Sequence, residues 1–131
     1  MAAVSKPWLK PLRHPRFWLA AWLAAVLTVI VVCLIPPPPL ALPQGSDKVE
    51  HFLAYFLLAG SAVQLFQRGR ALTWVGAALV LMGVAIEIAQ GALTQTRMAD
   101  PADALANTIG VLAGVATALT PWRDLLLRLR G

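Results

Sequence analysis

Few side chains in this chain are suited to chemistry, and they gather beside apolar segments. They are Asp47, Lys48, His51, Tyr55, Glu87, Gln90, Arg97, Asp100, Asp103 and Asn107. Positioned imidazole and carboxyl groups transfer protons in catalysis, so His51, Glu87 and Asp103 are the candidate catalytic acid–base residues. The sequence leaves open whether the protein is an enzyme.

The same set contains groups for binding an anion or a metal ion. Ammonium and guanidinium groups bind phosphate through charge-assisted hydrogen bonds. The candidate substrate-binding residues are Lys48, Tyr55, Gln90, Arg97 and Asn107. Carboxylate oxygens are ligands for hard divalent cations such as Mg²⁺. For such a cofactor the candidate metal ligands are Asp47, Glu87, Asp100 and Asp103.

Spacing of three or four residues places several of these side chains on shared helix faces. Asp47, His51 and Tyr55 form one stripe of this kind. A second stripe consists of Asp103, Asn107, Gly110 and Gly114. Its two glycines form a small-xxx-small pair, which is typical of closely packed membrane helices. We therefore predict that they serve helix packing and not chemistry.

The composition indicates a membrane protein with four helical spans. Hydrophobic residues make up 59% and charged residues 13% of the chain, which is far from the soluble globular norm. Apolar runs predict an all-α transmembrane domain over residues 17–120, with spans at about 17–35, 49–66, 71–93 and 102–119. A basic segment, residues 1–16, precedes this domain, and a basic tail, residues 121–131, follows it.

The positive charges predict the orientation. Nine of the eleven Lys and Arg residues lie before the first span, between the second and third, or after the fourth. The positive-inside rule then places both termini in the cytoplasm. This distribution flanks apolar segments and forms no single basic stripe, which argues against a nucleic-acid partner. Acidic residues contribute little to topology, so the concentration of carboxylates on the other side has a separate cause.

Glu87 is the polar residue that most needs an explanation. It lies about two turns inside its span, on the order of 10 Å deep. Ionisable residues inside spans almost always face the bundle interior and pair with other groups. We expect Arg97, Lys48 or His51 to be its partner.

Several of these residues also have simpler structural explanations. Asp47 and Glu50 have the spacing of a capping box at a helix start. Asn107 suits an interhelical hydrogen bond, and Tyr55 suits an anchor at the membrane interface. Cys33 is the only cysteine and is most simply a small packing residue.

Three segments, taken together, resemble the VanZ-like family of small membrane proteins. They are DKVEHFLAY from Asp47 to Tyr55, EIAQ from Glu87 to Gln90, and the pattern of Arg97, Asp100, Asp103, Asn107, Gly110 and Gly114. The resemblance covers the second to fourth spans, and the first matches only as a generic anchor. It implies a multi-pass protein of the bacterial cytoplasmic membrane. The founding member of the family is associated with low-level resistance to the glycopeptide teicoplanin.

Three functions remain in competition. The first is binding or processing of an anionic, phosphate-bearing envelope lipid or lipid-linked precursor at an outward-facing polar site. The second is a non-enzymatic envelope scaffold or ligand-binding protein whose polar cluster is structural. The third is a small multidrug-type transporter, which we rank last because the polar groups lie toward one membrane face and the halves show no repeat. The sequence does not indicate an oligomeric state.

Overall fold

The chain forms a helical bundle. The computed structural model describes residues 7–35, 46–93 and 100–130, excluding the side chains at 46, 47, 93 and 130. Its elements are α1 (Pro15–Leu34), α2 (Ser46–Leu65), α3 (Arg70–Leu93), α4 (Pro101–Ala116), the 3-10 helices η1 (Thr117–Leu119) and η2 (Pro121–Asp124), and α5 (Leu125–Arg130). Within these ranges the one β feature is a bridge between Leu9 and Phe66. The all-α prediction is confirmed, and the long helices begin within three residues of the predicted spans.

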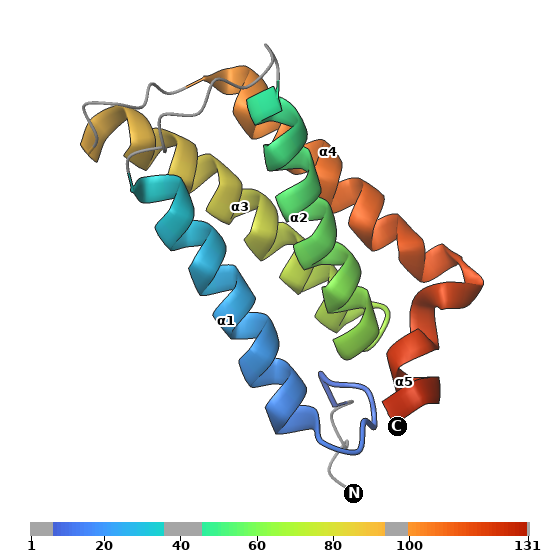
Figure 1. Cartoon of the computed structure of the whole chain (residues 1–131). Helices are drawn as coiled ribbons and strands as arrows, with labels where there is room; N and C mark the ends of the chain where they lie inside the picture. The colour runs from blue at the N-terminus through green and yellow to red at the C-terminus, as the bar shows by residue number, and fades with distance from the viewer. Residues whose placement is uncertain (1–6, 36–45, 94–99, 131) are drawn as a thin grey trace, which may run out of the picture.

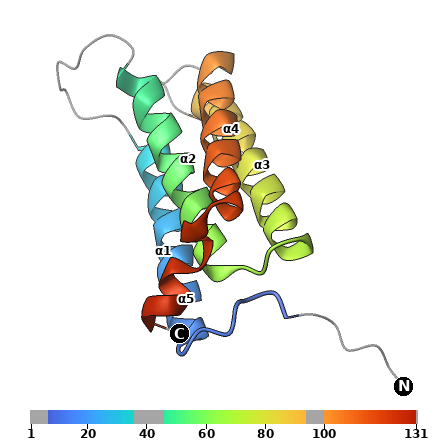
Figure 2. The same cartoon turned by 90° about the vertical axis from the view of Figure 1, so that its right-hand side faces the viewer.

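The four long helices lie side by side and define two ends of the molecule (Figures 1 and 2). The starts of α2 and α4 meet the end of α3 at what we call the polar end, which carries Lys48, His51, Asp100 and Asp103. The opposite, basic end carries Arg16, Arg68, Arg70 and Arg123 together with both terminal segments. The two kinds of charged residue distinguished in the sequence therefore occupy opposite ends of the fold.

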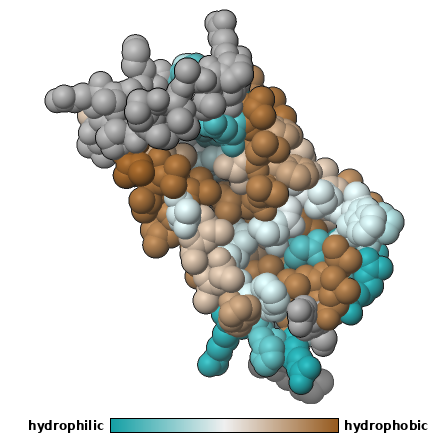
Figure 3. All heavy atoms as spheres, viewed as in Figure 1, coloured by the Kyte–Doolittle hydropathy of each residue, from teal (hydrophilic) through white to brown (hydrophobic). Residues whose placement is uncertain are grey.

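The outer surface between the two ends is apolar, as expected for a protein surrounded by lipid. Among the described residues, three helices are long and apolar enough to cross a membrane: Pro15–Leu34, Arg70–Ala92 and Pro101–Leu119. Their exposed side chains include Leu27, Leu81 and Leu112. Figure 3 shows brown, hydrophobic atoms over much of this surface and teal atoms toward the basic end. Exposed apolar surface of this extent indicates a membrane protein.

The helix α2 differs from the other three. It is the least apolar of the four long helices and is not among those that meet the length and hydropathy criteria for a span. It instead supplies much of the buried core, including Tyr55, Ala59 and Val63. A helix covered by its neighbours can carry polar residues that a lipid-facing helix cannot.

Two glycines allow α4 to approach the backbone of α2. A Cβ atom added at Gly110 would lie 2.5 Å from the Phe52 carbonyl oxygen. One added at Gly114 would lie 2.6 Å from the Ala59 Cβ and 2.7 Å from the Phe56 carbonyl oxygen. All three distances are below van der Waals contact, so only glycine fits at these positions.

The terminal segments pack on the basic end. The backbone N–H of Lys10 donates to the Leu65 carbonyl over 2.8 Å. The buried Lys10 ammonium lies 2.8 Å from an Asp124 carboxylate oxygen and donates to the Arg123 carbonyl over 2.6 Å. The hydrogen bond from Lys10 lowers the pKa of Asp124 below its ordinary value. One of the basic residues interpreted as topological thus also joins the two terminal segments.

Replacing Gly114 with alanine should destabilise the fold by about 1–3 kcal/mol, because the added methyl group overlaps atoms of α2 that cannot all move away. The matched control is Gly60→Ala, whose added Cβ meets nothing within 4 Å and which should gain up to about 1 kcal/mol from the better helix propensity of alanine. Unfolding of both variants in mild detergent measures the difference. Equal stability of the two variants would contradict the packing described for α2 and α4.

Candidate functional site at the polar end

His51 joins α2 to α4 at the polar end. Its Nδ1 lies 3.1 Å from the Asn107 side-chain oxygen, and its Nε2 lies 3.7 Å from an Asp103 carboxylate oxygen. Both ring nitrogens therefore face oxygen acceptors. The first distance is a hydrogen bond and the second is a looser contact, so His51 links two residues of one α4 face. The predicted stripes on the two helices do face each other here.

Lys48 bridges two carboxylates of the same cluster. Its ammonium lies 3.2 Å from Asp100 and 3.4 Å from Asp103. These distances exceed the 2.7–2.9 Å that is usual for strong charge-assisted hydrogen bonds, so the bridge is a loose one. About 43% of the Lys48 side chain stays exposed, so a ligand at the molecular surface can reach it.

Asp100 has a structural role that the sequence analysis missed. It is the N-cap of α4, where its carboxylate accepts the Ala102 backbone N–H over 2.9 Å and Pro101 follows as the first helical residue. This hydrogen bond and the one from Lys48 lower the pKa of Asp100. We had placed Asp100 in the preceding loop as a candidate metal ligand.

Glu87 is buried beneath this cluster, with 5% of its surface exposed. One carboxylate oxygen accepts the backbone N–H of Asp100, which ties α3 to the start of α4. The other oxygen has no hydrogen-bond partner within the described part of the chain. Of its three expected partners, Arg97 lies outside the described residues, while Lys48 and His51 contact Asp103.

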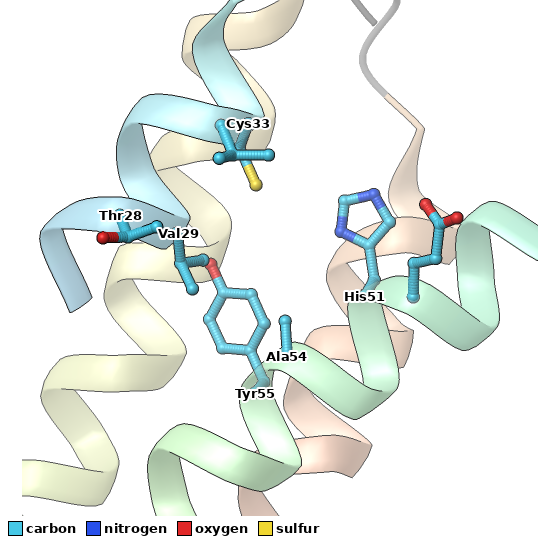
Figure 4. Close-up of a pocket in the computed structure, with 8 residues that line it drawn as sticks. Thr28, Val29, Cys33, His51, Ala54 and Tyr55 are labelled. Carbon is cyan, nitrogen blue, oxygen red and sulfur yellow. The ribbon is translucent and has the colours of Figure 1, made fainter. Parts of the chain in front are cut away.

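Tyr55 and Gln90 face α1 and not the cluster around Asp103. The Gln90 amide donates to the Cys33 carbonyl over 2.8 Å. Figure 4 shows the Tyr55 ring extending from α2 toward Val29 of α1. The predicted substrate-binding set is thus divided: Lys48 and Asn107 belong to the cluster, and Tyr55 and Gln90 belong to the boundary with α1.

A cavity of about 220 Å³ lies at this boundary. Its lining residues are Thr28, Val29, Val32, Cys33, Glu50, His51, Ala54 and Tyr55. Figure 4 shows that α1 forms one wall and α2 the other. His51 therefore belongs both to the hydrogen-bonded cluster and to the lining of a largely apolar cavity.

The α1 wall and one glycine are the functional features that sequence reasoning missed. Thr28, Val29, Val32 and Cys33 share one helix face, and Thr28 and Cys33 in the apolar second half of this helix were the available signal. Gly83 of α3 lets Asn107 and Tyr55 approach, because a Cβ there would lie 3.2 Å from the Asn107 Cβ. Neither feature belongs to the stripes that we predicted.

The structure does not test the expected divalent cation. In the described part of the chain no group of three or more His, Cys, Asp and Glu side chains is placed to hold a metal ion. The Asp47 side chain lies outside that part; its backbone falls one residue inside α2, which begins at Ser46. A Mg²⁺ site involving Asp47, Glu87, Asp100 and Asp103 stays a prediction.

Comparison with known proteins adds no assignment. No protein-family model, no curated protein and no solved structure matches this chain.

Acidification should destabilise the polar end through Asp100. Its pKa is depressed in the folded state, so the stability it contributes is present above its ordinary value of 3.8 and is lost as the pH falls through the lower folded-state value. Asp100→Asn keeps a capping side chain but removes the charge, so its stability should fall less than that of the wild type over this range. Unfolding in detergent from pH 7 down to about pH 2 measures both curves. Parallel curves would show that the contacts with Lys48 and Ala102 do not act on Asp100 as described.

Proposed function

We propose that this chain is a VanZ-like protein of the bacterial cytoplasmic membrane that binds an anionic, phosphate-bearing envelope lipid at its polar end. In this proposal the bundle crosses the membrane four times, with both termini in the cytoplasm and the polar end outside. The observation that carries the ligand assignment is the position of His51, which lines the apolar cavity and also joins the charged cluster.

The position of α2 supports a fourth span. It is 20 residues long, the same length as α1, and it lies alongside the three apolar helices (Figures 1 and 2). Its charged residues are grouped in its first turns and partly covered by α4, so most of its length meets other helices and lipid through apolar atoms. Mean hydropathy alone therefore does not identify such a helix as a membrane span.

The cluster and the cavity together suit an amphiphile. A lipid phosphate placed against Lys48 and His51 meets an ammonium group and an imidazole ring, and both can donate N–H groups to its oxygens. The hydrocarbon part of the same molecule then follows the cavity between α1 and α2, whose lining includes Val29, Val32 and Ala54. A soluble anion would use only the first of these features, and a neutral apolar molecule only the second.

The same geometry offers chemistry beyond binding. His51 beside Asp103 is a pair that can exchange a proton with a phosphate or its leaving group. A lipid-linked precursor of the cell envelope is then a candidate substrate. Processing of such a precursor would connect the proposal to the glycopeptide resistance that the resemblance to VanZ-like proteins suggests.

A structural role of the cluster is the second candidate. Its supporting observation is that Glu87, Asp100 and Lys48 join the ends of three helices. Variants of a purely structural cluster change stability and leave lipid binding unchanged. Measuring both properties on the same variants separates the two functions.

The orientation can be tested by fusing reporters to the C-terminus. A cytoplasmic C-terminus should give a fluorescent green fluorescent protein fusion and an inactive alkaline phosphatase fusion, because the positive-inside rule keeps the arginine-rich end inside. Fusions after Arg68, between α2 and α3, should behave the same way if α2 crosses the membrane as proposed. An active phosphatase at either position would contradict the four-span orientation.

Lipid binding can be tested by the thermal stability of the full chain in maltoside micelles. Phosphatidylglycerol should stabilise it at lower concentrations than phosphatidylcholine does. Lys48→Met should weaken this preference by up to about fivefold, the scale of an exposed ion pair. Asp100→Asn should strengthen it, because a carboxylate that competes with phosphate for Lys48 loses its charge.

Arg68→Met is the matched control for these variants. It removes an exposed positive charge at the basic end and should leave the effects of Lys48 and Asp100 intact. If Lys48→Met and Arg68→Met change the phosphatidylglycerol preference equally, the anion preference is a property of overall charge and the proposed site is wrong.

A further inference from the structure

The cavity between α1 and α2 contains a polar group without a partner. Tyr55 is 1% exposed, and its hydroxyl has no hydrogen-bond partner among the described residues. Buried polar groups of native proteins are almost always hydrogen-bonded, and tyrosine hydroxyls in particular find a partner when buried. The ring lines the cavity and its hydroxyl is directed toward α1 (Figure 4). The hydroxyl oxygen has less than 1 Å² of exposed surface, so a ligand in the cavity contacts it after a small shift of the lining side chains.

The cavity has a polar level and a deeper, apolar level. His51 of α2 and Cys33 of α1 lie at the level nearer the polar end, and Tyr55 and Val29 lie one helical turn further in (Figure 4). Four residues along a helix correspond to about 6 Å. The backbone of Tyr55 thus lies about one turn below that of His51, and its ring extends from there toward Val29 (Figure 4).

This depth discriminates between classes of lipid. In a glycerophospholipid the ester carbonyls follow the phosphate after the short glycerol backbone, a separation similar to one helical turn. A polyprenyl phosphate has only hydrocarbon below its phosphate and would leave the Tyr55 hydroxyl unpaired. The volume of about 220 Å³ suits a glycerol-ester segment and the start of a chain, since an apolar cavity of about 150 Å³ already takes a benzene molecule.

We propose that the lipid bound at this site is an ester-linked anionic glycerophospholipid, and that the Tyr55 hydroxyl donates a hydrogen bond to one of its ester carbonyls. The inference rests on the proposed function, because it assigns the phosphate of the same lipid to Lys48 and His51. The carbonyl satisfies the buried hydroxyl, and the chain beyond it continues along Val29 and out between α1 and α2.

Cys33 provides a natural reporter for the test. It is the only cysteine in the chain and lines the cavity at the level of His51. The full chain is purified in maltoside micelles, and the rate of Cys33 alkylation by N-ethylmaleimide is followed by intact mass. Ester-linked phosphatidylglycerol, its ether-linked analogue and a polyprenyl phosphate are each titrated against this rate, with phosphatidylcholine as the neutral reference.

The ester-linked lipid should protect Cys33 at about fivefold lower concentration than the ether-linked analogue or the polyprenyl phosphate, which is the scale of one neutral hydrogen bond. Tyr55→Phe should remove the difference between ester and ether lipids by weakening only the ester-linked one. The control places the cysteine elsewhere on α1, as Val31→Cys with Cys33→Ala. Val31 is 48% exposed on the outer surface, so alkylation there should not distinguish the lipids.

The outcomes separate this inference from the function on which it rests. Equal protection by anionic lipids and phosphatidylcholine would overturn the anionic-lipid function itself. Protection by anionic lipids that is the same for ester and ether linkages, or strongest for the polyprenyl phosphate, would overturn the ligand class and leave the function standing. If Tyr55 instead bonds Glu87, whose second carboxylate oxygen is also unpartnered, Tyr55→Phe lowers stability without changing the ester preference, and the inference is wrong. The comparison of linkages in the wild type decides the matter if Tyr55→Phe fails to fold.

Discussion

The close approach of α4 to α2 is the constraint on which the polar end depends. Lipid provides no hydrophobic force between helices, so they associate through van der Waals contact and hydrogen bonds. Gly110 and Gly114 bring the α4 backbone against Phe52 and Phe56. Only at this separation does His51 of α2 reach Asn107 and Asp103, which lie one and two turns before Gly110 on α4. The glycines and the polar residues on this face of α4 therefore act together, since the close packing at Gly110 and Gly114 allows the contacts of His51.

The charged residues at the two ends of the bundle differ in how closely they are paired. At the basic end, Lys10 is buried and paired with Asp124, while the arginines nearby remain exposed. The short contact between Lys10 and Asp124 thus links two chain segments. At the polar end, Lys48 and His51 share Asp103 at distances of 3.4 and 3.7 Å. Loose, shared contacts of this kind can rearrange around a ligand more readily than a closed pair.

Sequence reasoning located the helices and the facing stripes, because hydropathy and period are local properties of the chain. It could not determine how each helix is rotated about its axis relative to its neighbours. For that reason it grouped Gln90 and Tyr55 with Asp103, although both side chains face α1. It also treated α1 as a plain anchor, because a wall of a cavity is defined only by the helix opposite. The capping role of Asp100 was missed because the helix start was placed one residue late, at Ala102 instead of Pro101.

The anchoring of α1 bears on how a lipid could reach the site. Within α1 no residue is fully buried, and its described polar links to the bundle run from Trp22 to the Leu58 carbonyl and from the Gln90 amide to the Cys33 carbonyl. A helix held mainly by lipid-exposed contacts can separate from its neighbour at little cost, because lipid tails are as apolar as the surface they replace. The α2–α4 pair has no such freedom, since its backbones touch. For the lipid proposed above, lateral entry therefore fits the α1–α2 boundary, on the side of His51 where the cavity lies.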